Sequence, residues 1–215
     1  MEERMAKYGM DWDELYRITG FPKGAVWPST KVYWFKKYYP DLYEKTYKMV
    51  TPQALLIKAF GADDWYDDDT DAGWWQICNA DTFEYVPKLA EVFEVDIDKY
   101  PKNYKPGTRV GEVTPEVAKA TGLKVGTPLI MGSGDQQCGA IGVGNVKTGL
   151  ASVCLGTAGL VIGYSADPVR HPSGACHVLG HPGTGNYTME GHASASASAF
   201  RWVKNTIGDA EIEKA

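Results

Sequence analysis

The sequence predicts an α/β fold, and three features of the chain support that prediction. Through the centre, at residues 126–159, short apolar runs that end in glycine turns alternate with a helix-forming segment. Several earlier segments begin with an N-cap residue and end at glycine or proline, as helices do. After residue 159 the apolar residues recur with a period of two, which is typical of strands.

The composition is that of a globular protein. Of the 215 residues, 44% are hydrophobic and 23% are charged, which is ordinary for a chain that folds into one domain or two. The formal net charge of −5 argues against non-specific binding to nucleic acid. No apolar run reaches the length of a membrane span, and the charged N-terminus lacks a signal-peptide core. With 4 scattered cysteines that show no framework spacing, we expect a cytoplasmic protein with reduced thiols.

Two helices are predicted near the N-terminus. Asp11 is a suitable N-cap for the first, with Glu14 at the capping-box position and Gly20 as its stop. Ser29 caps the second, and Pro40 ends it because the residue before a proline disfavours the helical conformation. The lysines of the second helix either meet a phosphate group or form a solvated face; they are Lys31, Lys36 and Lys37.

Further helices are expected at residues 51–60, 86–93 and 114–122. Thr51 and Thr114 each stand before a proline, which places the proline at the first helical position. Leu55 and Leu56 give the first of these helices an apolar face. The polar, proline-bounded segment 96–106 is expected to be a loop.

An acidic run that ends at Asp71 invites a calcium interpretation, since Asp67, Asp69 and Asp71 alternate as calcium-loop ligands do. The loop would need glycine where Ala72 stands and a bidentate glutamate where Cys78 stands. The sequence therefore argues against a dedicated calcium site in this segment.

Two strands in the centre of the chain precede the residues with the clearest chemistry. The strand 128–131 ends in a glycine turn that Asp135 follows directly, and a carboxylate at such a turn can take a proton from a hydroxyl group. The strand 150–155 leads into a hairpin that lets backbone N–H groups approach a phosphate, namely Gly156, Thr157, Ala158 and Gly159. Together they suit phosphoryl transfer. In the alternative, Asp135 is only the N-cap of the next helix.

These motifs resemble the centre of the FGGY family of carbohydrate kinases. The similar segments are Gly-Thr-Pro-Leu-Ile-Met-Gly-Ser-Gly-Asp-Gln-Gln-Cys-Gly-Ala-Ile-Gly-Val-Gly at 126–144 and Ser-Val-Cys-Leu-Gly-Thr-Ala-Gly at 152–159. Flanking segments at 30–43 and 110–128 are similar too, so the resemblance spans 16–204. It implies a ribonuclease-H-like fold of the actin/hexokinase type and ATP-dependent phosphorylation of a sugar or polyol hydroxyl.

The resemblance implies roles for individual residues. Asp135 corresponds to the catalytic base, which deprotonates the attacking sugar hydroxyl, and Gln136 corresponds to a position that contacts the sugar in many members. The family's second phosphate loop, which contacts ATP, corresponds to Gly156, Thr157, Ala158 and Gly159. ATP and Mg²⁺ are therefore the implied cofactors. Many members have serine at position 158, and many pentulose kinases have asparagine at position 136, so the identity of the sugar stays open.

The resemblance covers only part of the family's length. Members begin with a strand and an Asp-x-Gly-Thr turn that binds phosphate and metal, and near the C-terminus they carry a Gly-Gly-Gly loop for adenosine. Neither stands in this chain, so we expect a fragment and assign no residue to the metal. Residues 1–148 would be the later part of the sugar-binding N-terminal domain, and 149–215 would begin the nucleotide-binding C-terminal domain.

Two tryptophans follow a segment that the resemblance places on the substrate side, around Thr70, Asp71 and Ala72. Trp74 and Trp75 are expected in a half-apolar strand, where they either stack on a sugar face or belong to the core.

The last third of the chain is predicted to form strands at 160–164, 175–179 and 186–190. Cys176, His177, His181 and His192 invite a zinc interpretation, but neighbouring residues of a strand point to opposite faces. The resemblance instead implies a structural segment that begins at His177.

A helix at 194–203, rich in small residues, is expected to pack closely between the two domains. The charged end, 208–215, is expected to fray.

Three functions stay open at the level of the sequence. The chain is a carbohydrate kinase or a piece of one, acting on a small-molecule sugar or polyol. Alternatively, it is an inactive sugar-binding or regulatory remnant that lacks the nucleotide loops. As a third alternative, it folds only with a partner segment or as an oligomer such as a homodimer.

Overall fold

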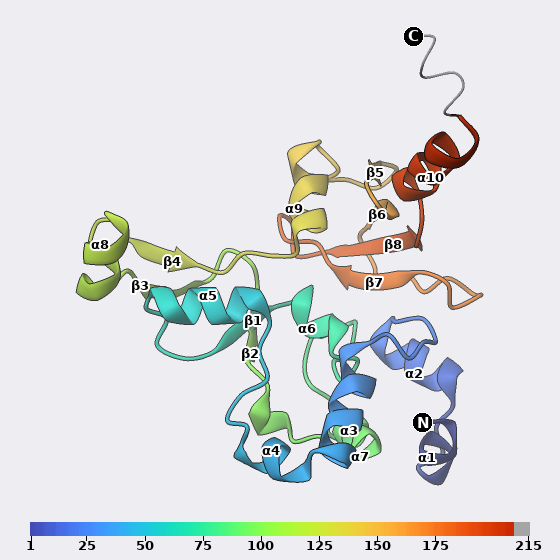
Figure 1. Ribbon diagram of the computed structural model, residues 1–215, viewed down its shortest axis with the longest axis horizontal. Helices are drawn as coiled ribbons and strands as arrows, with labels where there is room; N and C mark the ends of the chain where they lie inside the picture. The colour runs from blue at the N-terminus through green and yellow to red at the C-terminus, as the bar shows by residue number, and fades with distance from the viewer. Residues whose placement is uncertain (209–215) are drawn as a thin grey trace.

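The computed structural model describes residues 1–208, in which a mostly helical part carries a four-stranded sheet (Figure 1). The expected fraying of 208–215 thus concerns residues that lie almost wholly outside the described chain. The sheet is antiparallel with the order β5-β6-β8-β7, formed by β5 (Ala151–Leu155), β6 (Gly159–Ser165), β7 (His177–Gly180) and β8 (Tyr187–Ala193). These strands confirm the predicted change of period after residue 159. Helix α9 (Asp135–Gly142) packs against β5.

The helical part contains α1 (Glu2–Lys7), α2 (Trp12–Thr19), α3 (Pro28–Tyr38), α4 (Pro40–Lys45), α5 (Pro52–Phe60), α6 (Asp71–Trp74), α7 (Pro87–Phe93), the 3₁₀ helix η1 (Ile97–Lys99) and α8 (Pro115–Thr121). Two small sheets connect these helices. Strand β1 (Tyr66–Asp68) pairs in parallel with β2 (Lys102–Tyr104), and β3 (Arg109–Glu112) pairs antiparallel with β4 (Pro128–Ile130). The α/β prediction is confirmed.

The predicted helix starts rest on caps that the structure contains. The Asp11 carboxylate accepts a hydrogen bond from the backbone N–H of Glu14 at 2.8 Å, at the start of α2. The hydroxyl oxygens of Thr51 and Thr114 do the same for the N–H groups three residues on, at the starts of α5 and α8. Such caps are local, which is why the sequence predicts them.

The predicted cap of α3 is wrong. The helix begins at Pro28, and Trp27 is the N-cap residue without a side-chain cap bond. Proline is favoured at the first helical position because its fixed φ suits the helix and its missing N–H has no partner there in any case. Ser29 lies inside the helix, fully buried, and its hydroxyl donates to Oε1 of Gln76 at 2.9 Å.

Two other local predictions are corrected. Trp74 and Trp75 do not lie in a strand, because β1 ends at Asp68 and the chain turns into α6. The side chain of Asp68 stabilises this turn by accepting hydrogen bonds from the N–H and the hydroxyl of Thr70, at 2.8 and 2.6 Å. The segment 96–106 is not wholly a loop, since it contains η1 and the strand β2, which pairs with β1.

The largest hydrophobic core lies among the helices of the first part. Its fully buried members include Leu15, Ile77, Leu89 and Phe93. Leu55 and Leu56, expected to form the apolar face of α5, are 52% and 60% exposed instead. Helix α5 therefore contributes mainly through Ala54, which is fully buried.

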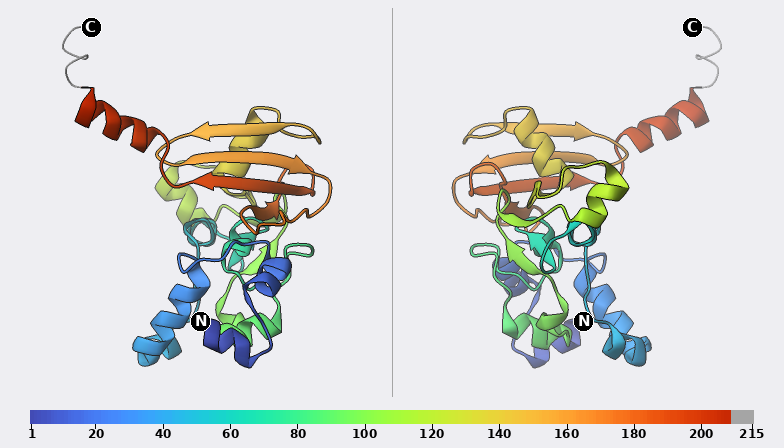
Figure 2. Two further views of the ribbon diagram at one scale, coloured as in Figure 1. Left: turned by 90° about the vertical axis from the view of Figure 1, so that its right-hand side faces the viewer. Right: turned by 90° about the vertical axis from the view of Figure 1, so that its left-hand side faces the viewer.

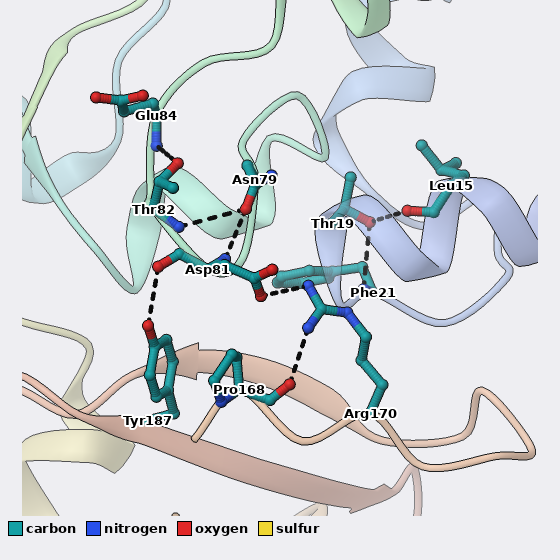
Figure 3. A network of polar contacts seen from close by, with 10 residues as sticks. All are labelled: Leu15, Thr19, Phe21, Asn79, Asp81, Thr82, Glu84, Pro168, Arg170 and Tyr187. Carbon is teal, nitrogen blue, oxygen red and sulfur yellow. Dashed lines mark hydrogen bonds and ion pairs between the residues drawn. The ribbon is translucent and has the colours of Figure 1, made fainter. Parts of the chain in front are cut away.

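Polar contacts fasten the sheet to the helical part (Figure 3). The carboxylate of Asp81 pairs with the guanidinium of Arg170 at 2.6 Å, and the hydroxyl of Tyr187 donates to the carbonyl oxygen of Asp81 at 2.8 Å. Nearby, the N–H of Val178 in β7 donates to the carbonyl oxygen of Gly20 at 2.9 Å. Because these bonds join segments far apart in sequence, they fix how the sheet sits over the helices.

The predicted helix near the C-terminus exists as α10 (Ala197–Ile207), but its expected close packing is wrong. None of its residues is buried, and Phe200 and Trp202 are 73% and 62% exposed. Its first turn touches the rest of the molecule, and the helix then extends away from the sheet (Figure 2). No helix within residues 1–208 is long and apolar enough to cross a membrane.

Candidate active site

The turn that carries Asp135 is clamped to the end of strand β1. The N–H of Gly134 donates to the hydroxyl oxygen of Thr70 at 2.8 Å, and that hydroxyl donates to Oδ1 of Asp68 at 2.6 Å. The hydroxyl of Ser133 also donates to Oδ1 of Asp68, at 3.2 Å. Both Thr70 and Asp68 are buried, so the position of the turn is set from within the protein.

Asp135 is the first residue of α9, and the N-cap residue is Gly134. The alternative that Asp135 serves only as the N-cap is therefore wrong. The backbone N–H of Gln136 donates to Oδ1 of Asp135 at 2.9 Å, and the positive end of the helix dipole favours a carboxylate at this place. The side chain is exposed, so the carboxylate can meet a ligand.

Asp135 lies at a cavity of about 660 Å³ between the helical part and the sheet. This volume is within the range of small-molecule binding sites. Residues from both parts line it: Val26, Trp27, Pro28, Lys31, Asp71, Trp74, Gly134, Asp135, Gln136, Gln137, Ala158, Leu160, His177, Glu190 and His192. Among the predicted site residues, the structure thus brings together Asp135, Gln136 and Ala158.

The remaining residues of the predicted phosphate loop lie beside the cavity. Gly156, Thr157 and Gly159 belong to the hairpin between β5 and β6 but do not line the cavity. The carbonyl oxygen of Thr157 accepts hydrogen bonds from the N–H of Ser196 at 3.0 Å and from the hydroxyl of Ser198 at 2.8 Å. The start of α10 therefore holds the hairpin from behind, and Ala158 is its point of contact with the cavity.

One carboxylate in the cavity was not assigned to the site by the sequence. Burial raises the pKa of Asp71 to about 6, with further contributions from the negative charges of Asp68 and Asp135. Oδ2 of Asp71 accepts a weak hydrogen bond from Nε2 of Gln53 at 3.4 Å. A signal existed, because the family resemblance assigns the segment around Asp71 to the substrate side.

A second carboxylate that sequence reasoning missed is Glu190 of β8, which is 3% exposed. Its Oε2 accepts a hydrogen bond from Nε2 of Gln137 at 3.0 Å. Its Oε1 lies 3.8 Å from Nδ1 of His177, which is beyond hydrogen-bonding distance. Burial raises the pKa of Glu190. Nothing local in the sequence distinguishes Glu190, because its neighbours in the cavity come from distant segments.

Part of the cavity lining is aromatic, since it contains Trp27 and Trp74. The rings of Trp27 and Trp74 lie 5.4 Å apart, and Phe21 packs on both, at 5.4 and 5.3 Å. Trp74 lines the cavity, so it can contact a ligand, whereas Trp75 is buried in the main core. The indole N–H of Trp75 donates to Oδ2 of Asp67 at 3.2 Å. The core role is thus confirmed for Trp75, whereas stacking of Trp74 on a sugar stays a prediction.

The lysines of α3 differ in their positions relative to the cavity. Lys31 lines the cavity, whereas the ammonium group of Lys36 donates to the carbonyl oxygen of Glu94 at 2.7 Å. Within residues 1–208, no three His, Cys, Asp or Glu side chains are grouped so that they could hold a metal ion. In particular, the Asp67–Asp71 run lies largely inside the fold, with Asp67 and Asp68 fully buried.

Comparisons with known proteins all point to the same family. The model of the FGGY family of carbohydrate kinases, N-terminal domain, matches residues 2–142. A curated relative, the xylulose kinase of Escherichia coli, is 26% identical over 195 residues. The match covers 89% of this chain and 39% of the relative, so the chain spans well under half the length of that protein.

Solved structures agree on the fold. A ligand-bound xylulose kinase from Lactobacillus acidophilus matches with a TM-score of 0.84 and 21% identity, over 95% of this chain and 41% of that one. A gluconate kinase from the same organism matches with a TM-score of 0.83 and 21% identity, over 95% and 41%. These matches confirm the predicted actin/hexokinase-type fold of sugar kinases, of which this chain has a part.

Proposed function

This chain belongs to the FGGY family of carbohydrate kinases, and on that premise we propose that its cavity binds a sugar or polyol whose hydroxyl is phosphorylated by ATP. The observation that carries the proposal is the position of Asp135. It is an exposed carboxylate on a clamped turn, at the edge of a cavity of about 660 Å³ that also contains Ala158 of the hairpin. An acceptor for a proton and a segment suited to phosphate thus border one cavity.

In the proposed reaction, Asp135 acts as general base. Its carboxylate accepts the proton of the substrate hydroxyl as the hydroxyl oxygen attacks the terminal phosphorus of ATP. Gln136 contributes an amide to sugar binding, and the indole of Trp74 offers an apolar face to the carbon chain. The clamp by Thr70 and Asp68 holds the base in place, which matters because small displacements of a catalytic group cost much rate.

The nucleotide and the metal differ in how well these residues suit them. Backbone N–H groups of the hairpin at Gly156, Thr157, Ala158 and Gly159 would contact the phosphates of ATP, and the position of Ala158 at the cavity supports this. Within residues 1–208 no three His, Cys, Asp or Glu side chains are grouped to hold a metal by themselves, and because Mg²⁺ in kinases is usually bound by one or two carboxylates together with the phosphates of the nucleotide, we assign no residue to it. No step of the reaction is therefore assigned to a metal held by this part of the protein.

A second candidate is a protein that binds sugar but does not transfer phosphate. The chain matches 36–39% of the length of curated kinases that include the xylulose kinase, so the phosphate transfer of those proteins is itself a proposal for this chain. Under either function we propose that residues 1–148 and 149–215 belong to two different domains. We also propose that the protein acts in the cytoplasm.

A thermal-shift experiment separates these two functions. The melting temperature is measured with Mg²⁺-ATP, Mg²⁺-ADP and a panel of ketoses and polyols, singly and in pairs. A ligand at a hundred times its dissociation constant should stabilise the protein by about 2.7 kcal/mol. A kinase predicts shifts with one sugar and with nucleotide, whereas the binding protein predicts a shift with sugar alone. No shift with any sugar would contradict both.

A further inference from the structure

The buried Glu190 carboxylate lines the cavity, and one of its two oxygens accepts no hydrogen bond from residues 1–208. Its Oε2 accepts the hydrogen bond of Gln137, while its Oε1 makes no hydrogen bond within residues 1–208 and lies 3.8 Å from Nδ1 of His177. Glu190 and Gln137 both line the same cavity as Asp135. A carboxylate oxygen in such a place gains by accepting a hydrogen bond from a ligand.

The neighbouring imidazole does not neutralise this carboxylate. His177 is 3% exposed, and neither of its ring nitrogens has a hydrogen-bond partner among residues 1–208. The rings of Phe21, Trp27 and Trp74 surround it at 5.1, 5.1 and 5.5 Å. This burial lowers the pKa of His177 to about 4, so the imidazole is uncharged at neutral pH and leaves the charge of Glu190 uncompensated.

The charges around the cavity have an unequal balance. Among its lining residues, three carboxylates stand against a single ammonium group, that of Lys31. The carboxylates are those of Asp71, Asp135 and Glu190, and they come from three different elements. Such a lining attracts groups that donate hydrogen bonds and repels a ligand that carries its own negative charge.

We propose that Glu190 is a specificity-determining residue, which accepts a hydrogen bond from a substrate hydroxyl remote from the reacting one and thereby selects uncharged polyols and ketoses over sugar acids. This inference rests on the proposed function. His177 lies beside Glu190 in the cavity lining and, being uncharged, does not cancel its charge. A sugar acid would put a carboxylate, which has no proton to donate, against an acceptor that is buried and already negative.

Proteins of this fold differ in whether their named substrate is a neutral sugar or a sugar acid. The structures that match this chain include a xylulose kinase and a gluconate kinase, with TM-scores of 0.84 and 0.83. A fold that accommodates a neutral ketose in one protein and a sugar acid in another must discriminate through side chains. Specificity of this kind comes from unfavourable contacts with the wrong ligand as well as from favourable contacts with the right one.

Two matched pairs of probes test the selection directly: xylitol with xylonate, and glucitol with gluconate. Within each pair the carbon chain is the same, and only a terminal CH₂OH group is replaced by a carboxylate. Dissociation constants are measured by titration calorimetry at pH 7. We expect the wild-type protein to bind the better polyol at least about tenfold more tightly than its acid, because hydrogen bonds to charged groups are strong and unmade ones are costly.

Two variants then attribute the selection to Glu190. Glu190→Gln keeps the shape of the side chain and can still bond to Gln137, but it removes the charge. It should therefore reduce the preference for the polyol, given by the ratio of the two dissociation constants, by about tenfold. Glu190→Asp keeps the charge on a shorter side chain, so it should keep the ratio while weakening polyol binding. Glu84→Gln, on an exposed turn, is the control and should change neither constant. Melting curves of each variant verify the fold.

The outcomes distinguish this inference from the proposed function. Wild-type protein that binds a polyol but binds its acid as tightly overturns the inference alone, and so does an unchanged ratio in Glu190→Gln. If that variant does not fold, the ratio in Glu190→Asp and in the wild type still decides. Wild-type protein that binds none of the four probes overturns the proposed sugar site and the inference together.

Discussion

The clamp on the Asp135 turn predicts that the variant Thr70→Val is strongly destabilised. Valine has nearly the shape of threonine but lacks the hydroxyl, which donates to Asp68 at 2.6 Å and accepts from the N–H of Gly134 at 2.8 Å. The side chain is 1% exposed, so water cannot take over either bond without rearrangement. The change therefore removes these two bonds, together with a longer contact of 3.2 Å to the hydroxyl of Ser133, and adds no cavity.

The expected magnitude follows from the two groups that lose a partner. A hydrogen bond to a charged group contributes about 1.5–3 kcal/mol, and a fully buried N–H left without an acceptor costs about 1–3 kcal/mol, which is an upper bound for the partly buried N–H of Gly134. Since the two bonds share one hydroxyl, their losses do not add fully. We expect the free energy of unfolding to fall by about 2–4 kcal/mol, measured by urea denaturation at pH 7.

A matched control is Thr121→Val. The hydroxyl of Thr121 donates to the carbonyl oxygen of Val117 at 2.7 Å, but this side chain is exposed and water can replace it. Its removal should change the free energy of unfolding by less than about 0.5 kcal/mol. The reasoning is refuted if Thr70→Val is as stable as the control, since the clamp would then contribute nothing to the position of the turn.

Three further changes test other parts of the structure. Gly61→Ala should lower the free energy of unfolding, measured by urea denaturation, by about 1–3 kcal/mol or more, because φ is +124° and the new Cβ would lie 2.2 Å from a carbonyl oxygen. Gly107→Ala is the control: its φ is +87° and the space around it is open, so its loss should be distinctly smaller. Equal losses would show that the contact is unimportant. Burial raises the pKa of Asp67 from 3.8 to about 7, so its contribution to stability is full below pH 3.8 and is lost as the pH rises through 7. The stability of wild type relative to Asp67→Asn should therefore fall over this window, by at most about 1.4 kcal/mol per pH unit, and a constant difference in urea titrations would contradict it. Leu179→Ala, at a fully buried site, should cost about 2–5 kcal/mol, whereas Leu155→Ala, at a site 72% exposed, should change the unfolding free energy by less than about 0.5 kcal/mol; similar effects would overturn the assignment of the core.

The sequence was most informative where structure is determined locally. The caps at Asp11, Thr51 and Thr114 were predicted because a cap involves residues three positions apart. The strand, turn and helix around Asp135 were predicted for a similar reason, since apolar runs and glycines mark them directly. At Ser29 the same reasoning failed, because two good helix-start residues stood next to each other and Pro28 took the position.

The cavity could not be predicted in the same way. Asp71, Asp135 and Glu190 lie on α6, α9 and β8, and their proximity depends on how the sheet packs over the helices. Single-sequence patterns carry no information on such packing. The family resemblance supplied Asp135 and Gln136, and the sequence offered His177 only as a possible zinc ligand. Glu190, with His177 as its neighbour, became a candidate only when burial and hydrogen-bond partners could be seen.

The same limit explains α10. Its sequence of small residues followed by Phe200, Arg201 and Trp202 suggested a closely packed helix, yet the described residues offer only the hairpin at Thr157 as a neighbour. Periodicity shows that a helix has an apolar face, but it does not show what covers that face.

The most direct test of the central claim compares Asp135→Asn with the wild type in two measurements. The first is ADP release with Mg²⁺-ATP and the sugar that stabilises the protein most, and the second is the binding constant of that sugar. We expect the wild type to release ADP and the variant to be slower by about 10²–10⁴-fold, because asparagine cannot accept the proton. Sugar affinity should change by less than about tenfold, since one hydrogen bond is altered. Undiminished ADP release by Asp135→Asn would contradict the assignment of Asp135 as the general base.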